Sequence, residues 1–571
     1  MTCPISEIEL PWTRQQLSVP REDGTLFSSP SLHEATELAA CNHVSLTNES
    51  YDVQGRSLER LRRWTRESAC RAARKYTSEL TGTTIPEVDF DLLFVAGHQP
   101  SLFHPGVWSK NFSIGQLAMH TNGVGLNLVV DNDIMSWTRI RVPCGNREAP
   151  SVEMIEFDED RSPRPWEDAS VVNEELFRSF GDRLTAAMQR WNLNPVVTQM
   201  WPNAVTHMLR SPRLTDCLTA ARSRLERRWG LGNLELLISH LCRLDPFLWF
   251  TAHILAHLPR FRDIHNRVLL EYRQINRIRS RTHPVPDLKE AGDWLEAPFW
   301  IWRTGDLKRS RVFAKQVGHE VRLSDGTHTF AKLPLTADGE ACRAVDVLRD
   351  LSAGKIKLRT RALTTTLFTR LCLSDLFVHG IGGAKYDEIT DHIIARFFRV
   401  TPPGFLTLSA TLDLPFAKPF VVETDDHTRL QDLLRELKYN SQRHLTAGTN
   451  GNADKLMAQK ARLVSEQKSV MTNSVSRRIR RKRSRSNFQR FRQFQELNEQ
   501  LATFTQPQRQ RIEDERQMVV SQLHANSILN DREFSFCLYP IESIQSFMNG
   551  IWDMSAVAHK PGHFQKTASD D

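Results

Sequence analysis

The first third of the chain has a pattern of hydrophobic and polar positions that predicts a helix followed by a strand, a helix and a strand. Residues 56–80 place leucine, alanine and tyrosine at helical spacing between arginines, which is typical of an amphipathic helix. The apolar run 92–96 leads into the turn 97–106 and a helical pattern, and a second apolar run follows at 126–131. Two strands joined by a helix predict a βαβ unit, and hence a parallel sheet with a right-handed crossover.

A second strand, turn and helix occur in the later half of the chain. The run 375–379 is followed by the glycine-rich turn 380–383, a helical pattern and the strand-like residues 405–411. The segment 298–335 has alternating apolar and polar residues and an Asp-Gly turn at 325–326, which predicts a small β insertion. We therefore expect an α/β chain.

The remaining segments predict connections and helices. Residues 145–170 are rich in proline, serine and acidic side chains, which predicts an exposed connection, and 171–282 have a helical pattern. From about 425 to 527 the chain is rich in glutamine, arginine, leucine and lysine, which predicts an antiparallel helical hairpin. We expect the last segment, 532–547, to pack on the core.

Composition excludes several classes of protein. Of 571 residues, 40% are hydrophobic and 25% are charged, which is typical of globular chains and not of disordered, collagen-like or membrane proteins. The nine cysteines form no CxxC pair, as in proteins with reduced intracellular thiols. The N-terminus lacks a signal-peptide pattern, and the most apolar stretch, 234–258, contains Arg243, Asp245 and Pro246. We expect a cytoplasmic protein without a membrane span.

The net charge of +8 has a local source. Residues 477–492, called the basic tract below, contain nine lysines and arginines and no acidic residue, which leaves the rest of the chain close to neutral. Phe488, Phe491 and Phe494 lie in or beside this tract. Two interpretations stay open: a solvated helical arm, or a surface that binds nucleic acid or another anionic partner through phosphate contacts.

The turn 97–106 has the position of a ligand site. It follows a predicted parallel strand and opens a helix, where free backbone N–H groups and the helix dipole favour an anion. Its sequence is neither a P-loop nor GxGxxG, and the alternative is a tight turn with a surface histidine. The candidate residues that it offers are Gly97, His98, Gln99, Ser101, His104 and Lys110.

The residues Asp131, Asn132 and Asp133 end the next predicted strand. An acidic side chain at this point of a nucleotide-binding βαβ unit can accept hydrogen bonds from a ribose hydroxyl, or Asp131 and Asp133 could bind a metal. The alternative is a helix cap or an exposed turn. Because this turn neighbours the first one, a functional role is the favoured interpretation.

The second glycine-rich turn repeats the arrangement of the first. Glycines let the backbone approach a ligand closely, and a lysine in the first turn of the helix could meet a phosphate or carboxylate. Two arginines that precede this strand could supply bidentate contacts to an anion. The alternative is a structural turn with surface basic residues. The candidates are Arg359, Arg361, Gly380, Gly382, Gly383 and Lys385.

The sequence predicts no metal site. His253 and His257 are four residues apart on a predicted helix, a spacing that can bind zinc. No glutamate occupies the HExxH position and no third ligand is evident, so a packing role is favoured. GxSxG and Cys-His signatures of nucleophilic catalysis are also absent.

Four segments, in this order, resemble the bacillithiol biosynthesis cysteine-adding enzymes, a family often described as cysteine ligases. AGHQPSLFHPGVWSKNF (96–112) resembles the family segment TGQQ-x-GLF-x-GP-x-YT-x-YK, and VDND (130–133) occupies the place of its EDHD. LRTRALTTTLF (358–368) resembles its LRPLYQDTLLP, and GIGGAKY (380–386) resembles its GPGEIAY. Helix, strand and a long coiled coil follow in both, so the resemblance covers nearly the full length. The first segment matches at Gly97, Gln99, Leu102, Phe103 and Lys110.

The resemblance implies a Rossmann-like parallel-sheet core, similar to nucleotidylyltransferases, with helical and small β insertions and a C-terminal antiparallel coiled coil that commonly mediates dimers. The activity that it implies is attachment of cysteine to an amino-sugar malate conjugate. This chain departs from the family where its QQ is His98-Gln99, where EDHD has Asn132 in place of histidine, and where the glutamate of GPGE is Gly383. These departures indicate a relative with a changed substrate.

The predicted domain organisation has six parts, and the resemblance supplies the names of several. They are the first half of the Rossmann-like core (1–145), a mainly helical connecting insertion (146–290), a small β insertion (291–340), the second half of the core (341–424), a coiled-coil arm (425–530) and a C-terminal segment that packs on the core (531–571).

The predicted function is a ligase-like or transferase-like condensation on a small polar substrate. His98 and His104 would stabilise charge on a reacting carboxyl or phosphoryl group, and the cationic side chains named above would hold anionic groups. Asp131 and Asp133 would orient a ribose, an amine or a metal, and Asp133 is counted among the catalytic residues. The sequence leaves the cofactor open, with ATP or ADP, with or without magnesium, as the candidates, and a homodimer through the coiled coil is a candidate assembly. The alternative is a non-catalytic scaffold whose basic arm binds nucleic acid or a protein partner.

Overall fold

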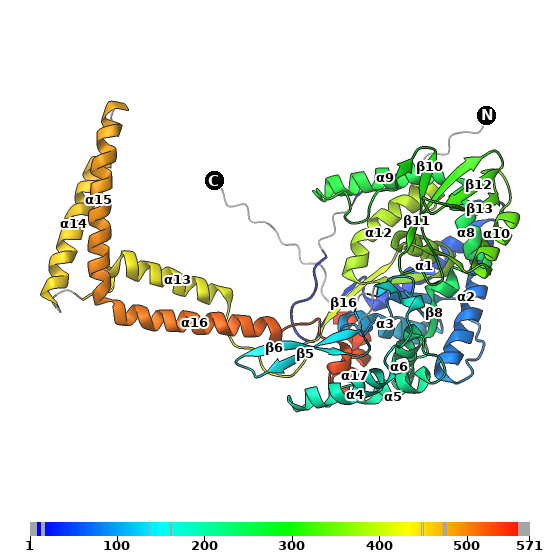
Figure 1. The fold of residues 1–571 in the computed structure, drawn as a ribbon, viewed down its shortest axis with the longest axis horizontal. Coiled ribbons are helices and arrows are strands. Elements are labelled where there is room, and N and C mark those ends of the chain that lie inside the picture. The colour runs from blue at the N-terminus through cyan, green and yellow to red at the C-terminus, as the bar shows by residue number, and fades with distance from the viewer. Residues whose placement is uncertain are drawn as a thin grey trace. The chain divides into compact units, whose positions relative to one another are not determined.

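The computed structural model describes residues 8–12, 17–135, 137–159, 163–446, 448, 450–471 and 477–557. The chain divides into two compact units (Figure 1). The first unit contains Met1–Val142, Glu153–Pro415 and Arg532–Asp571, and the second contains Pro143–Val152 and Phe416–Asp531. The polypeptide therefore leaves the first unit twice and returns to it twice.

A six-stranded sheet, called the main sheet below, lies within the first unit and has the strand order β1-β16-β15-β2-β3-β8. Five of these strands run parallel to one another, and β1 pairs with β16 in the antiparallel direction. The unit is thus a mixed α/β structure with a mixed sheet. The strands are β1 (Thr25–Ser29), β2 (Leu93–His98), β3 (Val124–Val129), β8 (Leu234–Leu237), β15 (Leu376–His379) and β16 (Leu406–Thr411).

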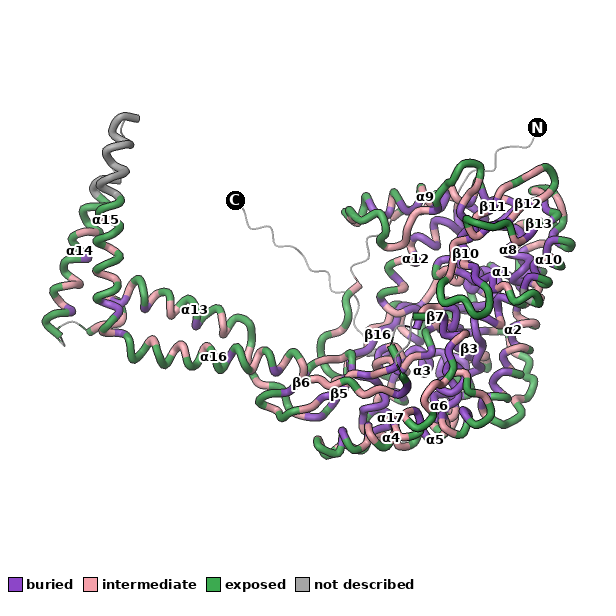
Figure 2. The backbone as a smooth tube through the Cα atoms, in the orientation of Figure 1, coloured by how far each residue is buried: buried purple, intermediate pink, exposed green. Residues whose placement is uncertain are grey.

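The central strands are buried on both faces, as is typical of parallel strands that are covered by helices. Every residue of β8, β15 and β16 is buried, and β2 is buried at all but one residue (Figure 2). The helix α3 (Pro105–Thr121) connects β2 to β3 and is buried along most of its length. Pro105 occupies the first helical position, where its missing N–H costs nothing.

A second, antiparallel sheet in the same unit has the order β13-β12-β11-β10-β14, with β9 paired to β10. It extends beyond the small β insertion that we predicted over 291–340, because β14 joins it. The register of β10 against β11 shifts between Ala297 and Trp300, and Pro298, which has no N–H to donate, lies inside this bulge. The strands are β9 (Glu290–Ala291), β10 (Trp294–Arg303), β11 (Ser310–Val317), β12 (Glu320–Ser324), β13 (Thr329–Pro334) and β14 (Ile356–Thr360).

The segment between the two sheets is not wholly helical. We predicted helices throughout 171–282, but residues 234–237 form β8, which lies at one edge of the main sheet. A run of four apolar residues looks the same in a buried strand and in a buried helix, so periodicity does not separate them. The helices of this segment are α4 (Glu174–Gln189), α5 (Val197–Met208), α6 (Leu214–Arg228), α7 (Ile238–Leu241), α8 (Asp245–Ala256) and α9 (Leu258–Ile275). Two further helices, α1 (Leu32–Thr47) and α2 (Leu58–Thr81), precede β2 in the chain.

The prediction of an exposed connection over 145–170 is only partly right, because several residues of 145–154 are exposed but most of the described residues after 156 are not. Residues 150–156 form a strand, and Asp158, Trp166 and Glu167 are buried. Acidic side chains can be buried when they are paired or hydrogen-bonded, so polar composition alone does not identify an exposed segment. The short elements here are β4 (Ile134–Met135), β5 (Arg139–Gly145), β6 (Pro150–Glu156), β7 (Arg164–Pro165) and η1 (Trp166–Asp168).

The C-terminal segment of the first unit packs on α3. The N–H of Phe536 donates to the carbonyl of Phe103 at 2.9 Å, and the Phe536 ring lies 4.3 Å from the ring of Trp108. Phe536, Leu538 and Tyr539 are buried. The remaining elements of the unit are α10 (Cys342–Ala353), α11 (Ala362–Phe368), η2 (Thr369–Leu373), α12 (Ile381–Ile393), η3 (Ile394–Phe398), η5 (Phe536–Leu538), α17 (Ile541–Asn549) and α18 (Ile551–Val557).

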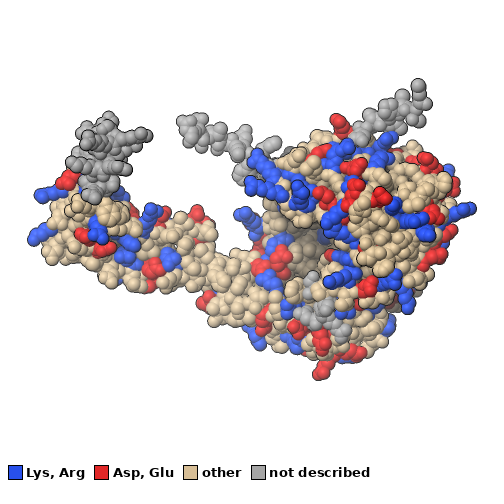
Figure 3. Space-filling model, turned by 45° about the horizontal axis from the view of Figure 1, so that its top comes forward, with Lys and Arg blue, Asp and Glu red and all other residues tan. Residues whose placement is uncertain are grey.

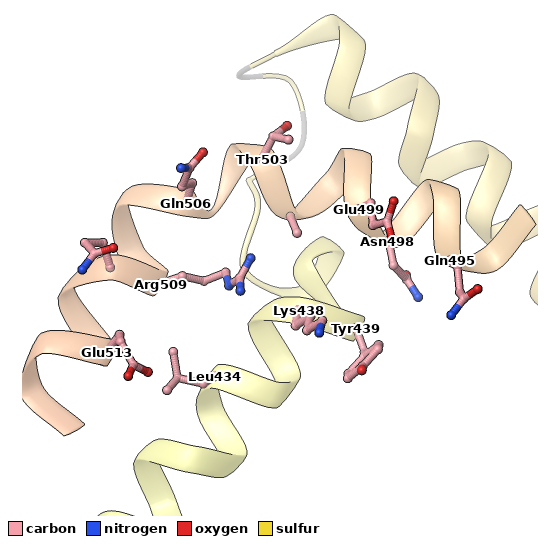
Figure 4. Close-up of a pocket in the computed structure, with 12 residues that line it drawn as sticks. Leu434, Lys438, Tyr439, Gln495, Asn498, Glu499, Thr503, Gln506, Arg509 and Glu513 are labelled. Carbon is pink, nitrogen blue, oxygen red and sulfur yellow. The ribbon is translucent and has the colours of Figure 1, made fainter. Parts of the chain in front are cut away.

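The second unit is mainly helical. The helix α13 (Thr424–Tyr439) packs along α16 (Gln506–Leu529), α14 (Gly451–Met471) packs along α15 (Arg477–Phe504), and η4 (Ser441–Arg443) follows α13. The helices α13, α15 and α16 line a polar groove of about 630 Å³ (Figure 4). Long helices over 425–527 agree with the sequence pattern, whereas their assembly as a coiled coil stays a prediction. Within the described residues of the whole chain, the helices are too short or too polar to cross a bilayer.

Candidate functional site

A cavity of about 270 Å³ lies beside the carboxyl end of β3, where the main sheet approaches the second sheet. The turn after β3, the bulged part of β10, the start of β11, the turn between β14 and α11, and α9 all contribute to its wall. Three of the residues chosen from the sequence meet here: Asn132, Asp133 and Arg361. The polar side chains that line it are Asn132, Asp133, His265, Trp300, Arg309, Arg311, Thr360, Arg361, Thr364 and Thr365.

Each of the three arginines that line this cavity contacts Trp300, which also lines it, or the buried side chain of Glu296. Arg361 Nη2 donates to Glu296 Oε1 at 2.7 Å, and Arg311 Nη1 donates to Glu296 Oε2 at 3.3 Å. The guanidinium groups of Arg361 and Arg309 lie 4.4 and 4.9 Å from the centre of the Trp300 ring, within the range of cation–π attraction. Burial lowers the pKa of Arg361 and Arg309, but a guanidinium stays protonated at neutral pH.

The turn after β3 supplies a second polar part of the wall. Asp133 Oδ1 lies 3.1 Å from Arg309 Nη2, and the other oxygen of Asp133 accepts a hydrogen bond from Gln99. Asn132 Nδ2 donates to the carbonyl of Thr360 at 2.9 Å. Asn132 Oδ1 is buried and has no hydrogen-bond partner among the described residues, so a ligand could satisfy it. Gln99 thus links the first predicted turn to the cavity.

His98 and Lys110 point into the protein and do not line this cavity. His98 Nε2 lies 2.9 Å from Asn111 Oδ1, and its Nδ1 lies 3.1 Å from the carbonyl of Gln99. Burial holds the pKa of His98 well below its usual value, so the ring is neutral. Lys110 Nζ donates to the carbonyl of Gly97 at 2.9 Å, and burial lowers the pKa of Lys110 to about 8. For these two residues the geometry favours the structural alternative.

The rest of the first turn also has structural contacts. His104 caps α3, because its Nδ1 accepts a hydrogen bond from the N–H of Gly106 at 3.1 Å, and its Nε2 lies 3.7 Å from Glu533 Oε2. Ser101 is half-buried in the loop between β2 and α3. A Cβ atom at Gly97 would make only ordinary contacts, at 3.7 Å or more, so space does not require glycine there.

Asp131 and Arg359 belong to a buried cluster of charges and do not line the cavity. Asp131 accepts hydrogen bonds from the N–H of Ser239 at 2.8 Å and from its hydroxyl. Arg359 makes two hydrogen bonds of 3.0 Å with Glu167. Burial, together with the charge of Glu167, raises the pKa of Asp131 to about 7. These contacts use the polar atoms that we had assigned to a ribose or an anion.

The second glycine-rich turn opens α12 at the carboxyl end of β15, which pairs with β2. A Cβ atom at Gly380 or Gly382 would meet nothing within 4 Å, so there is open space beside this backbone. A Cβ atom at Gly383 would lie 2.7 Å from Nδ1 of His379, so this position needs glycine. Lys385 is exposed. The turn offers room for a ligand but lies outside the lining of the cavity.

Several residues of the cavity were missed by the sequence argument. They lie in segments predicted as a β insertion and a helical insertion, to which we assigned no function. The only local signal is the basic group at 308–311 that follows the aromatic run 299–302. The missed residues are His265, Trp300, Arg309 and Arg311 in the lining, and Glu296, which pairs with two of the arginines.

The described residues contain no group of three or more side chains that could hold a metal ion. His253 Nε2 lies 3.2 Å from the hydroxyl of Tyr51, and the rings of His253 and His257 are 4.8 Å apart. Burial lowers the pKa of His253 to about 3. These contacts fit the packing role that the sequence favoured for the pair.

The basic tract begins α15 in the second unit, and its side chains from 477 to 487 lie outside the described residues. Phe488 and Phe491 are 61% and 57% exposed, and the guanidinium of Arg492 lies 5.7 Å from the Phe488 ring. On the face of the first unit seen in Figure 3, basic and acidic side chains are interspersed. This mixture agrees with the near-neutral charge of the chain outside the tract.

No known protein-family model matches the sequence, and no curated protein shows significant similarity to it.

Proposed function

We propose that the cavity beside β3 is the substrate site of a ligase-like or transferase-like condensation on a small anionic substrate. The observation that carries this proposal is the meeting of Asn132, Asp133 and Arg361 with Arg309 and Arg311 in one cavity. A guanidinium binds a carboxylate or a phosphate through two parallel hydrogen bonds. Since three arginines face two carboxylates here, the uncompensated positive charge favours an anion.

The order of the parallel strands supports the Rossmann-like core that belongs to this proposal. Numbered along the chain from β2, the strands have the spatial order 3-2-1-4-5. In sheets of this order, ligands bind outside the carboxyl ends of strands 1 and 4, which here are β2 and β15. Open space beside Gly380 and Gly382 lies at this point. We place the candidate cofactor, ATP or ADP with or without magnesium, at this crevice.

The charged residues of the cavity have separate roles in the proposed condensation. The arginines hold the carboxyl or phosphoryl group that reacts, and Asp133 orients the attacking amine or hydroxyl. Gln99 in turn fixes the carboxylate of Asp133. The attacking nitrogen or oxygen forms a bond to the carbon or phosphorus, its proton passes to the carboxylate of Asp133, and the leaving group departs with its electron pair. Preorganised charges of this kind stabilise the negative charge that develops in the transition state.

A thermal-shift screen with matched variants tests the proposal. ATP, ADP, cysteine and sugar-malate conjugates are tested with and without magnesium, because a ligand at a hundredfold excess over its Kd adds about 2.7 kcal/mol to the stability of the folded state. We expect Arg361→Gln to weaken binding of an anionic ligand at least tenfold, about 1.4 kcal/mol. Arg322→Gln on β12, outside the cavity, is the control. Unchanged binding by Arg361→Gln, or no binding at all, would contradict the proposal.

A second candidate function is favoured by the exposed aromatic rings beside the basic tract. Phe488 and Phe491 present more than half of their surface to solvent next to arginines. Many proteins bind single-stranded nucleic acid by stacking its bases on such rings and by contacting its phosphates with basic side chains. In this alternative the first unit is a scaffold. Oligonucleotide binding that weakens steeply with salt, and is lost in Phe488→Ala/Phe491→Ala, would favour it.

A further inference from the structure

His265 lines the cavity and is held in one orientation by its neighbour. It lies on α9 and is only 4% exposed. Its Nδ1 is 3.1 Å from Asn266 Oδ1. The Asn266 amide is itself fixed by Leu288, because its Nδ2 donates to the Leu288 carbonyl and its Oδ1 accepts from the Leu288 N–H, both at 2.9 Å. An oxygen facing Nδ1 requires the hydrogen on Nδ1, which leaves Nε2 as the basic nitrogen of the ring.

The surroundings of His265 favour its neutral form. Burial lowers the pKa of His265 to about 4, and the charge of Arg361 acts in the same direction. The hydrogen bond with Asn266 and the charges of Asp287 and Glu296 act in the opposite direction. The charged groups around the cavity, taken element by element, are Glu296 on β10, Arg309 and Arg311 at β11, Arg361 before α11 and Asp133 after β3. Asp287, after α9, is outside this count of charges because it pairs with Arg273 on α9 at 2.6 Å.

We propose that the cavity takes up a small dianion together with one proton, and that Nε2 of His265 binds this proton. The proposal rests on the proposed function, since it concerns the same cavity. The three arginines exceed the two carboxylates by one positive charge, and a protonated His265 makes this excess two. A phosphate monoester or another tetrahedral oxyanion of charge −2 matches it. His265 is therefore a proton-binding group of the anion site.

The sign of the linkage follows from the charges. A dianion beside Arg361 opposes the field that keeps His265 neutral, so the pKa of His265 rises when the anion binds. Proton binding and anion binding then strengthen each other. Between the two pKa values, that of the free protein and that of the complex, the affinity for the anion falls up to tenfold for each unit of rising pH. Above the pKa of the complex, the affinity no longer depends on His265.

Sulfate is the probe for the test, because its charge does not change between pH 5 and 8. Calorimetric titrations at pH 5.5, in buffers that differ in ionisation enthalpy, give the number of protons taken up per sulfate bound. We expect close to one proton for the native protein, and close to none for His265→Gln, which still binds sulfate more weakly. His253→Gln, a buried histidine on α8 outside the cavity, is the matched control and keeps the full uptake.

Asn266→Asp provides a second variant in case His265→Gln does not fold. A carboxylate beside Nδ1 stabilises the imidazolium, so His265 holds its proton before sulfate binds, and the uptake falls. If sulfate binds without proton uptake, or if the uptake persists in His265→Gln or is unchanged in Asn266→Asp, the role of His265 is overturned while the anion site stands. If sulfate does not bind, or binds equally well to Arg361→Gln, both the anion site and the role of His265 are overturned.

Discussion

The carboxyl group of Asp131 is buried, and its contribution to the free energy of unfolding depends on pH. Burial and the negative charge of Glu167 raise its pKa to about 7, although the hydrogen bonds from Ser239 act in the opposite direction. In an unfolded chain an aspartate titrates near pH 3.9. Between about pH 4 and pH 7 the folded protein binds a proton that the unfolded chain does not bind. The contribution of Asp131 to stability therefore falls as the pH rises through this range.

We predict that Asp131→Asn removes this loss of stability. Asparagine has nearly the same shape and retains an oxygen for the N–H of Ser239, but it carries no charge. The free energy of unfolding of the variant, relative to the native protein, should rise by ~2–4 kcal/mol between pH 4.5 and 7.5. Urea denaturation at several pH values measures it.

A second variant tests whether the hydrogen bond from Ser239 controls this pH dependence. Ser239→Ala removes the hydroxyl that donates to Asp131, so the pKa of the carboxyl should rise further and the loss of stability should continue to higher pH. Parallel stability profiles for Asp131→Asn and the native protein would contradict the assignment of the effect to this carboxyl group.

The start of α12 separates a structural glycine from one that is open to a ligand. At Gly383 an added methyl group would lie 2.7 Å from Nδ1 of His379, and His379 cannot swing away freely because it pairs with buried Asp387. At Gly382, in the same helical turn, the methyl group would meet nothing within 4 Å.

We predict opposite effects for alanine at these two positions. Gly383→Ala should destabilise the protein by ~1–3 kcal/mol, because the neighbouring ring must move. Gly382→Ala should be neutral or stabilising by up to about 1 kcal/mol, because alanine favours the helix. If a nucleotide binds at this turn, Gly382→Ala should also weaken nucleotide binding, which the thermal-shift screen measures. Equal destabilisation by both variants in chemical denaturation would contradict the steric argument.

The elements that the sequence predicted well are those whose ends are marked by clear turn residues. β2, α3 and β3 follow one another with a turn between apolar runs, and β15 is followed by glycines. β8 and β14 were missed because four or five residues do not distinguish a strand from a helix, and because pairing partners lie far away in the sequence. Strand pairing across such distances is decided by tertiary packing, which single-sequence patterns do not contain.

The candidate site was predictable in the same limited sense. Asn132 and Asp133 were chosen because they follow a predicted strand, and Arg361 because it precedes one and could bind an anion. All three line the cavity. His98 and Lys110 satisfied the first of these criteria, but their side chains turn inward to Asn111 and to a backbone carbonyl. The position of a residue after a strand indicates the edge of the sheet where it lies, and not the direction of its side chain.

The division of the chain into two compact units has a consequence for unfolding. Each unit has buried apolar side chains of its own: Phe536 is 1% exposed in the first unit, and Leu501 is fully buried in the second. A unit with its own core can unfold as one cooperative step. We therefore expect two transitions in differential scanning calorimetry of the intact protein.

Substitutions in the two cores should shift one transition each. Phe536→Ala leaves a hole against Trp108 and should destabilise the first unit by ~3–5 kcal/mol, although residue 536 follows the whole second unit in the sequence. Leu501→Ala should destabilise the second unit by ~2–5 kcal/mol and leave the other transition in place.

The two variants, Phe536→Ala and Leu501→Ala, also show which transition belongs to which unit. A ligand that stabilises one unit can then be assigned to that unit. A ligand of the cavity beside β3 must raise the transition that Phe536→Ala lowers, whereas an oligonucleotide bound by the basic tract must raise the one that Leu501→Ala lowers. A single transition that both variants lower equally would mean that the units unfold together.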